Sequence, residues 1–278
     1  MTADVNLIVV CGATASGKTR LGVELARRYD GEIISVDSRQ VYRGLDIGSG
    51  KDLDEYITPD GPVPYHLIDI VDPQQVYSLW NYLEDFDRVF GEVTARDRLP
   101  VAVGGTGLYL EAVLRGYEIP QMPADEDLRT QLMQEPRDSL EQRLQQLDPE
   151  RYRSLDPTGG KRRLVRAIEV ALGEAEAGGS RTAAVSADLR PLVLVIRWDR
   201  EELRRRVATR LDERLASGLV EEVQTLVDAG LNKERLDQLG MEFRHVGRFV
   251  LGETSREQMR TDLVQAIGQL VKRQDTYF

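Results

Sequence analysis

The sequence predicts an α/β fold in which helices flank a parallel β-sheet, with an all-helical insert domain. Short β-branched runs at 5–12, 32–37 and 192–199, and a further run that begins at residue 99, alternate with helical periodicity. This alternation is typical of parallel strands joined by crossover helices. Residues 120–190 show no strand pattern. The 278 residues are 41% hydrophobic, which is enough for one large core and an insert.

Each element of the core follows from a local pattern. The run 5–12 is apolar and ends in glycine, as in a buried parallel strand. Residues 18–29 place apolar side chains at helical spacing, and 32–37 forms the second strand. The stretch 99–110 passes from a strand through two glycines into a helix that begins near Leu108.

The middle of the chain has a different pattern. We predict helix, turn, helix, turn, helix over PQMPADEDLRTQLMQE, SLEQRLQQLDPERYRSL and GGKRRLVRAIEVALGEAEAGGS. Residues 174–190 contain few bulky side chains and are expected to form a flexible linker. The tail, 200–278, is expected to be mostly helical. The predicted domains are therefore a core, 1–118 with 191–278, and a helical insert, 119–190.

Composition limits the possible functions. A net charge of −10 argues against a protein that is coated in positive charge to bind nucleic acid non-specifically. Cys11 is the single cysteine, so neither an internal disulfide nor a cysteine metal cluster is expected. The N-terminal apolar run is too short for a signal peptide or a membrane span. We therefore expect a cytoplasmic protein that does not associate with membranes, and a monomer.

Residues 12–19, GATASGKT, match the phosphate-binding loop pattern G-x-x-x-x-G-K-[ST] between a predicted strand and a predicted helix. Glycines let successive backbone N–H groups face one anion, and the helix N-terminus adds its positive dipole. Lys18 supplies an ammonium group, and the Thr19 hydroxyl can ligate Mg²⁺. The pattern predicts a P-loop NTPase-like core that binds polyphosphate or pyrophosphate with Mg²⁺. It does not by itself specify a nucleotide such as ATP.

Asp37 stands at the carboxyl end of the second predicted strand, where ligands bind in open α/β sheets. A carboxylate at this place can hold Mg²⁺ or accept a proton from a nucleophile. The structural alternative is an aspartate that only caps a turn. Two classes of enzyme remain open at this point: a small-molecule kinase, and a transferase that releases pyrophosphate.

An ordered series of motifs extends along nearly the whole chain. They are GATASGKT (12–19), SVDSRQVYRGLDIGSGK (35–51), YHLIDIVDPQQVYS (65–78), LPVAVGGTGLYLEAVLRG (99–116), KRRLVRAIEV (161–170), RLASGLVEEVQTL (214–226) and KRQDTYF (272–278). In this series the chain resembles the tRNA dimethylallyltransferase (tRNA isopentenyltransferase) family. The resemblance implies a prenyltransferase that moves a dimethylallyl group from its diphosphate to N6 of an adenine beside the anticodon, at tRNA position 37. The phosphate-binding loop would then hold the diphosphate that leaves.

The resemblance also implies roles for particular residues. It makes Asp37 the base that deprotonates the amine, and it makes Lys18 and Arg210 the groups that stabilise the departing charge. Arg206 and Arg210 lie four residues apart, on one face of a predicted helix. The charge pattern alone favours a solvent-exposed basic face there, because acidic residues are interspersed along the same helix. The implied diphosphate-binding residues are Gly12, Ala13, Thr14, Ala15, Ser16, Gly17, Lys18, Thr19, Arg206 and Arg210. Thr19 would hold the Mg²⁺ cofactor.

The segment 159–166, GGKRRLVR, carries four positive charges in six residues and no acidic residue. In an acidic chain this cluster predicts a local electrostatic site for nucleic acid, and the structural alternative is an ordinary basic start of a helix. The resemblance implies that it contacts tRNA together with DSRQ (37–40) and the Gly-Gly-Thr turn. The implied tRNA-binding residues are Asp37, Ser38, Arg39, Gln40, Thr106, Arg129, Arg162, Arg163, Leu164, Val165 and Arg166. The expected partners are a tRNA anticodon stem-loop and dimethylallyl diphosphate.

Three alternatives remain beside this hypothesis. An adenylate isopentenyltransferase would use the same chemistry on free AMP, ADP or ATP. A P-loop small-molecule kinase would transfer a phosphoryl group and need no allylic diphosphate. An inactive relative would bind RNA only, although Lys18, Thr19, Asp37 and Arg210 are all present. The helical insert with its basic segment favours an RNA acceptor, because a free nucleotide needs no such platform.

Overall fold

The computed structural model describes residues 5–121, 125–157, 159–177 and 182–278. The chain divides into two compact units. Unit 1 contains Met1–Tyr117 and Ala184–Phe278, and unit 2 contains Glu118–Ala183. Residues 184–190, which we assigned to the insert from sequence, belong to unit 1.

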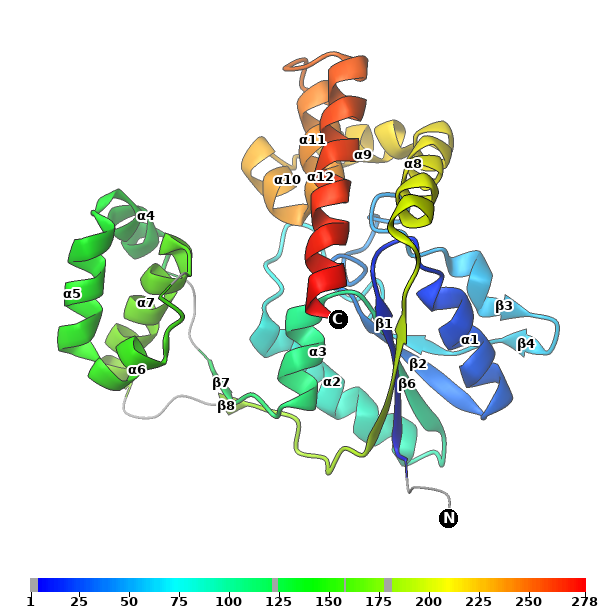
Figure 1. Ribbon diagram of the computed structural model, residues 1–278, viewed down its shortest axis with the longest axis horizontal. Helices are drawn as coiled ribbons and strands as arrows, with labels where there is room; N and C mark the ends of the chain where they lie inside the picture. Colours follow the sequence, from blue (N-terminus) through cyan, green and yellow to red (C-terminus); the bar gives the residue numbers. More distant parts are fainter. Residues whose placement is uncertain (1–4, 122–124, 158, 178–181) are drawn as a thin grey trace. The chain divides into compact units, whose positions relative to one another are not determined.

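Unit 1 is built on a five-stranded parallel sheet in the order β5-β2-β6-β1-β9, which confirms the predicted fold class (Figure 1). The strands are β1 (Leu7–Gly12), β2 (Gly31–Val36), β5 (Tyr65–His66), β6 (Leu99–Gly104) and β9 (Pro191–Ile196). The register pairs Gly104 with Cys11 on one side and with Val36 on the other. The carboxyl ends of β1, β2 and β6 therefore meet at one edge of the sheet, as expected for a ligand site in this architecture.

Helices cover both faces of this sheet (Figure 1). Helix α1 (Lys18–Arg28) packs closely on β6, because a Cβ added to Gly22 would lie 2.4 Å from the Val103 Cγ2 atom. Helices α2 (Leu79–Thr94) and α3 (Gly107–Leu114) lie against the opposite face. The helix predicted near Leu108 is α3, which begins one residue earlier.

A second group of helices lies beyond the carboxyl ends of the strands (Figure 1). It consists of α8 (Arg200–Ala216), α9 (Leu219–Asp228), α10 (Lys233–Leu239), α11 (Met241–Val250) and α12 (Arg256–Tyr277). These helices share an apolar core with residues 41–45 of the loop after β2. Small elements not predicted from sequence complete unit 1: η1 (Leu53–Tyr56), β3 (Ile57–Thr58), β4 (Gly61–Pro62) and β5.

Unit 2 contains four helices within its described residues, around a core of its own that includes Leu132, Leu140 and Ile168. They are α4 (Glu126–Gln134), α5 (Arg137–Leu147), α6 (Pro149–Ser154) and α7 (Lys161–Ala177). Two short strands, β7 (Ile119–Pro120) and β8 (Thr182–Ala183), pair antiparallel. The Asp148 side chain accepts a hydrogen bond from the Arg151 N–H at 2.8 Å and starts a new helix there.

Unit 2 departs from the sequence prediction in three places. The predicted second helix is divided into α5 and α6 at the Asp148 cap. The predicted linker 174–190 is wrong at its start, because α7 continues to Ala177 and β8 occupies Thr182–Ala183. Residues 178–181 lie outside the described part of the chain. The β7–β8 pair was missed because two-residue strands are too short to show a period-2 pattern.

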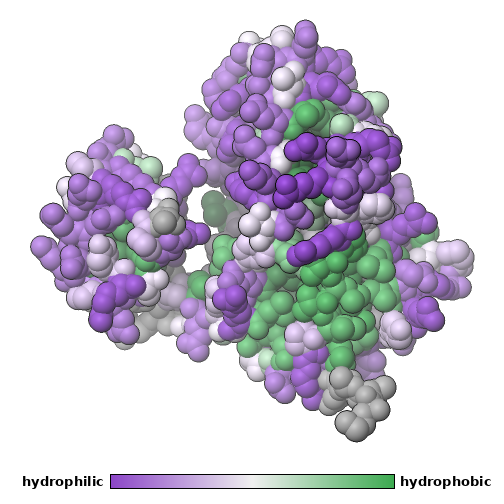
Figure 2. Space-filling view, in the orientation of Figure 1, coloured by the Kyte–Doolittle hydropathy of each residue, from purple (hydrophilic) through white to green (hydrophobic). Residues whose placement is uncertain are grey.

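One edge of the sheet is apolar and open. Leu192, Val193 and Val195 of the edge strand β9 are 40–46% exposed, and Figure 2 shows an apolar patch over this part of unit 1. Edge strands of this kind offer unpaired backbone groups to other chains. Among the described residues, no helix has both the length and the apolar character that a membrane span requires.

Buried charges hold the loop that follows β2. The Lys51 side chain is 1% exposed, and its ammonium group donates to the Tyr42 carbonyl at 2.9 Å and to the Asp46 carboxylate at 2.6 Å. It also contacts the Asp69 carboxylate. Such a buried ammonium requires its partners, because an unpaired charge away from water is strongly unfavourable.

Glu222 of α9 secures the same loop from the other side. Its carboxylate accepts hydrogen bonds from the backbone N–H groups of Asp46, Ile47 and Gly48 at 2.7–2.9 Å. Burial raises the pKa of Glu222, and the three N–H donors oppose this rise. Lys51 and Glu222 together fix residues 46–51, which form one wall of the cavity described below.

Replacement of Lys51 by Met tests this anchoring. We expect the free energy of unfolding to fall by about 1.5–3 kcal/mol, because charge-assisted hydrogen bonds of a buried group are lost. Urea denaturation measures the change. The control is Lys272→Met, since Lys272 is exposed on α12. Equal stability of the two variants would show that Lys51 does not anchor the loop.

Candidate active site

The phosphate-binding loop joins β1 to α1 at the carboxyl edge of the sheet. Gly12 has φ +142° and a Cβ there would lie 2.6 Å from the Ile196 carbonyl oxygen, so this position requires glycine. Gly17 has φ +88° and precedes the first residue of α1. Within the described residues, the backbone N–H groups of 15–19 make no hydrogen bond. Five successive donors at a helix N-terminus are thus available for an anion.

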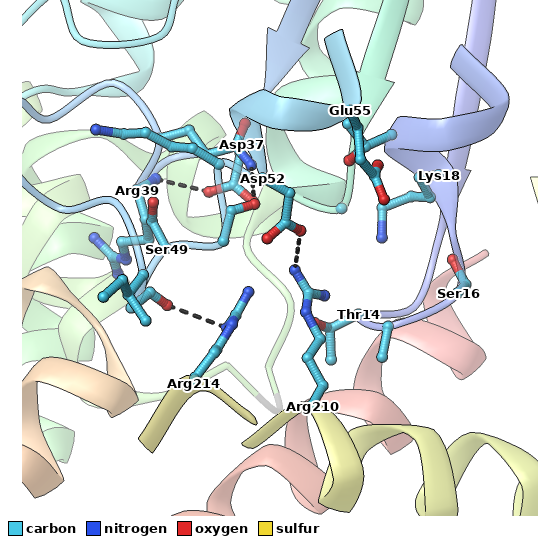
Figure 3. Close-up of a pocket in the computed structure, with 18 of the residues that line it drawn as sticks. Thr14, Ser16, Lys18, Asp37, Arg39, Ser49, Asp52, Glu55, Arg210 and Arg214 are labelled. Atoms are coloured by element: carbon cyan, nitrogen blue, oxygen red, sulfur yellow. Dashed lines mark hydrogen bonds and ion pairs between the residues drawn. The ribbon is translucent and has the colours of Figure 1, made fainter. Parts of the chain in front are cut away.

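The loop borders a cavity of about 930 Å³. Residues 46–56, the end of β6, one side of α8 and the last turns of α12 form the other walls. Figure 3 shows polar and charged side chains from several of these segments around the cavity. Every lining residue belongs to unit 1, so one compact unit contains the whole cavity.

Lys18 is the basic side chain of the phosphate-binding loop. Its ammonium group donates to the Ala13 carbonyl at 2.7 Å. The pKa of Lys18 is lowered to about 8, mainly by burial; Asp37 opposes this shift, and the nearby Arg210 adds to it. Cys11 lies below the loop at the end of β1; it is 2% exposed, and burial raises the pKa of its thiol.

Arg206 and Trp198 support the outer side of the loop. The Arg206 Nε–H donates to the Ala15 carbonyl at 3.1 Å, and the Trp198 indole N–H donates to the Ser16 carbonyl at 2.9 Å. The Arg206 guanidinium carbon also lies 4.2 Å from the centre of the Trp198 ring, a cation–π contact. Arg206 lines the cavity, as the predicted diphosphate-binding role requires. Its Nε–H group, however, is already bound to the loop.

Arg210, the predicted clamp, reaches the cavity one helical turn beyond Arg206. Its Nη2 atom lies 2.7 Å from the Asp52 carboxylate (Figure 3). Asp52 has φ +47°, in the left-handed region, and precedes η1. An anion bound at Arg210 would therefore displace the Asp52 carboxylate or share the Arg210 guanidinium group with it.

Asp37 and Thr106 follow β2 and β6, which end side by side. The Thr106 hydroxyl accepts from the Ser38 N–H at 3.0 Å, and the Thr106 N–H donates to the Val36 carbonyl at 3.2 Å. One Asp37 oxygen accepts from the Arg39 N–H at 2.8 Å, so Asp37 does cap a turn. Its second oxygen accepts no hydrogen bond within the described residues and remains available for chemistry.

Two glutamines connect these loops. The Gln274 amide oxygen accepts from the Thr14 N–H, and its nitrogen donates to the Gly105 carbonyl, both at 2.9 Å. Gln274 therefore joins the phosphate loop to the glycine turn after β6. Gln40 accepts from the Ser35 hydroxyl at 2.8 Å and donates to the Gly50 carbonyl at 2.9 Å. Gln40 was predicted to contact tRNA, and in this structure its side chain holds the wall of the cavity.

Sequence reasoning did not assign five side chains that line or support the cavity. They are Asp52, Trp198, Arg214, Glu242 and Gln274. Glu242 lies in the first turn of α11, and burial raises the pKa of its carboxyl, against the effect of Arg214. Gln274 and Arg214 lie inside motifs quoted above, KRQDTYF and RLASGLVEEVQTL, but nothing in either motif indicates which side chain faces the cavity.

The predicted RNA-binding residues of unit 2 lie around the start of α7. Arg162 and Arg163 are exposed, and Arg163 makes a loose ion pair with Asp156 at 3.6 Å. Lys161 donates to the Met133 carbonyl at 2.7 Å. Arg162 and Arg163 are therefore the side chains of this segment that the structure presents most openly.

The other predicted residues of this unit are more enclosed. Arg166 and Arg129 both pair with Glu169, at 2.7 and 3.0 Å. Leu164 and Val165 are buried in the core of unit 2, so their side chains support the helix and do not reach the surface.

The described residues offer few protein ligands for Mg²⁺. The described residues contain no group of three or more His, Cys, Asp or Glu side chains that could hold a metal ion. The Thr19 hydroxyl lines the cavity next to Lys18. Mg²⁺ commonly binds through one or two protein oxygens together with substrate phosphates, and Thr19 beside an anion loop fits that arrangement.

Comparisons with known proteins agree with this geometry. Residues 40–278 match the IPP transferase family, and residues 5–59 match the isopentenyl transferase family. The chain is 50% identical to tRNA dimethylallyltransferase 2 of Syntrophotalea carbinolica, over 98% of this chain and 89% of that protein. It is 49% identical to tRNA dimethylallyltransferase 2 of Shewanella sediminis, over 98% and 88%. A crystal structure of tRNA isopentenylpyrophosphate transferase from Bacillus halodurans aligns with a TM-score of 0.67 at 33% identity, covering 98% of this chain and 86% of the other.

The lowered pKa of Lys18 predicts how pyrophosphate binding depends on pH. Above pH 8, Lys18 loses its proton in the protein without ligand. Bound pyrophosphate favours the charged ammonium form of Lys18, so binding at this pH takes up a proton. We expect the affinity to fall by up to about tenfold per pH unit above pH 8. Isothermal titration calorimetry in buffers of different ionisation enthalpy measures both quantities.

Lys18→Arg is the matched control, since arginine stays charged throughout this range and the ionisation of pyrophosphate is common to both proteins. Parallel pH profiles for native protein and variant would contradict the assignment of this titration to Lys18.

Proposed function

The chain belongs to the IPP transferase family, and from this premise we propose that it is a tRNA dimethylallyltransferase. It transfers the dimethylallyl group of dimethylallyl diphosphate to N6 of the adenine next to the anticodon, at tRNA position 37, and releases diphosphate. One observation carries the proposal: the cavity that contains the free N–H groups of residues 15–19 also contains Asp37. An anion site and a base thus face one space.

The loop and its cations suit a diphosphate leaving group. The bond between the allylic carbon and oxygen breaks easily, because the positive charge is delocalised over the allyl group. The electron pair stays on the diphosphate oxygen, and the charge that builds up there is the main obstacle. Backbone N–H groups, Lys18, Arg206 and Arg210 are all placed to stabilise such charge.

Asp37 suits the acceptor side of the reaction. An aromatic amine is a weak nucleophile, so removal of its proton as the new N–C bond forms assists transfer. The Arg39 N–H holds one Asp37 oxygen, and the other can take the proton from N6. In this mechanism the turn bond orients the carboxylate, and the structural and catalytic roles of Asp37 coexist.

Mg²⁺ is the cofactor that this site would use. Thr19 would hold it together with oxygens of the diphosphate. When bound, the ion would supply positive charge to the departing diphosphate. The residues of the chain would still orient both substrates and exclude water.

An anticodon loop suits a site in which the adenine must enter a cavity. Extrusion of a base from its stack is unfavourable, but least so in a single-stranded loop. The basic segment with Arg162 and Arg163 supports an RNA acceptor, and Ser38, Arg39 and Thr106 lie beside the cavity edge. A free adenylate remains the alternative acceptor.

The function is tested with dimethylallyl diphosphate, Mg²⁺ and either an anticodon stem-loop or AMP. Mass spectrometry shows which acceptor gains the prenyl group, and we expect the stem-loop to gain it. In Asp37→Asn the rate should fall by about 10²–10⁴-fold, since a general base is lost, while pyrophosphate binding stays close to native.

The control for this variant is Asp72→Asn. Asp72 makes the same type of turn bond, to the Gln74 N–H at 2.8 Å, but lies outside the cavity. Undiminished turnover by Asp37→Asn would exclude its role as base. Prenylated AMP with unmodified stem-loop would replace the tRNA proposal by the adenylate alternative.

Charge reversal tests the basic segment of unit 2. Arg162→Glu and Arg163→Glu should each weaken stem-loop binding and reduce the slope of log K against log salt by about 0.7–0.9, the value for one phosphate contact. Fluorescence anisotropy over a range of salt concentrations measures both effects. Arg88→Glu changes the net charge equally at an exposed position on α2. If all three variants keep the native slope, this segment makes no phosphate contact.

A further inference from the structure

Arg214 and Arg210 converge on one point of the cavity wall. They are four residues apart on α8 and therefore project from the same helical face. A Cβ built on Gly50 would lie 1.7 Å from the Arg214 Nη2 atom and 2.4 Å from the Arg210 Nη2 atom. Both guanidinium groups thus meet directly over the backbone of Gly50.

The two arginines differ in how their charges are compensated. Arg210 has a close ion pair with Asp52 at 2.7 Å. Arg214 has one hydrogen bond within the described residues, a long contact of 3.4 Å to the Gly48 carbonyl. The carboxylates of Glu242, Asp52 and Asp37 lie close enough to favour its charge, but none pairs with it. Burial and the neighbouring Arg210 together lower the pKa of Arg214.

The wall below these groups leaves room for both of them. Gly50 has φ +66° and no side chain, and the two guanidinium groups occupy the space that a side chain would need. The buried Lys51 and the Glu222 carboxylate hold the loop around Gly50 in place. Two like charges that are gathered over a fixed backbone position and line the same cavity form an arrangement that an anion would stabilise.

We propose that Arg214 and Arg210 together bind one phosphate group. The proposal rests on the function proposed above, which brings two phosphate sources to this cavity: the allylic diphosphate and the phosphodiester of the acceptor RNA. Two planar forks can each donate paired N–H bonds to phosphate oxygens. The phosphate would relieve the repulsion between the guanidinium groups and give Arg214 the anionic partner that it lacks.

A purely structural role for Arg214 leads to a different expectation. If its function were only to hold the Gly48 carbonyl, its loss would lower stability and leave phosphate affinity unchanged. Binding measurements on folded protein therefore separate the two roles.

The experiment uses Arg214→Met, which keeps the length of the side chain without its charge, and Arg214→Lys, which keeps the charge without the fork. The control is Arg204→Met, because Arg204 is exposed on the same helix and does not line the cavity. Thermal unfolding verifies that each variant is folded. One arm titrates inorganic pyrophosphate by calorimetry, and the other titrates anticodon stem-loop RNA without allylic substrate by anisotropy.

We expect Arg214→Met to lose about 10- to 100-fold in affinity in one arm, the effect of a charge-assisted hydrogen bond, with Arg214→Lys intermediate. A loss in the pyrophosphate arm identifies the diphosphate as the source, and a loss in the RNA arm identifies the acceptor. Affinities equal to those of Arg204→Met in both arms overturn the proposal. If Arg214→Met does not fold, Arg214→Lys decides by the same criteria.

Transfer by the native protein is measured in parallel. Absence of transfer with every acceptor would contradict the proposed function, whereas a native protein that transfers normally, with both arms unchanged in the variants, would contradict only the phosphate site.

Discussion

Crowding of partly buried positive groups is the constraint on which the cavity of unit 1 depends. Five backbone N–H groups, Lys18, Arg206, Arg210 and Arg214 gather at one edge of a parallel sheet, in a chain whose net charge is −10. Desolvation makes such a concentration costly in the empty protein, and the lowered pKa of Lys18 and of Arg214 reflects that cost. A bound polyanion removes the repulsion. The same crowding of cations that disfavours the empty site therefore favours a diphosphate within it.

The acidic residues of the chain have the complementary task of holding the cavity open. Glu222 fixes the loop 46–48 through three N–H groups, and Asp46 and Asp69 enclose the ammonium of Lys51. Asp37 orients its own carboxylate through a turn. These contacts fix the backbone of Gly50 beneath Arg210 and Arg214. Neutral Gln274 joins the phosphate loop to the turn after β6 without adding charge to either.

The sheet, the phosphate-binding loop and Asp37 could be predicted from sequence because each has a local sequence pattern. The loop 12–19 carries its own pattern of glycines and a lysine, and the strands before it and after α1 are continuous apolar runs. Asp37 followed from its place after a strand. Arg214, Asp52 and Gln274 could not be identified in this way, because their importance comes from contacts with segments distant in sequence, such as Gly50 with α8 and Thr14 with α12. The sequence pattern also did not indicate that Leu164 and Val165, which lie inside a basic segment, belong to the core of unit 2.

The burial of Cys11 has a practical consequence. The only thiol of the chain lies at the end of β1, beneath the phosphate loop, out of contact with water and with a raised pKa. Thiolate, the form that reacts with maleimides, is therefore scarce and shielded. The native protein should therefore react little with thiol-directed labels. Single cysteines introduced on the surfaces of the two units would accept fluorophores selectively. Energy transfer between such dyes would then report changes in the distance between the two labelled positions while RNA binds.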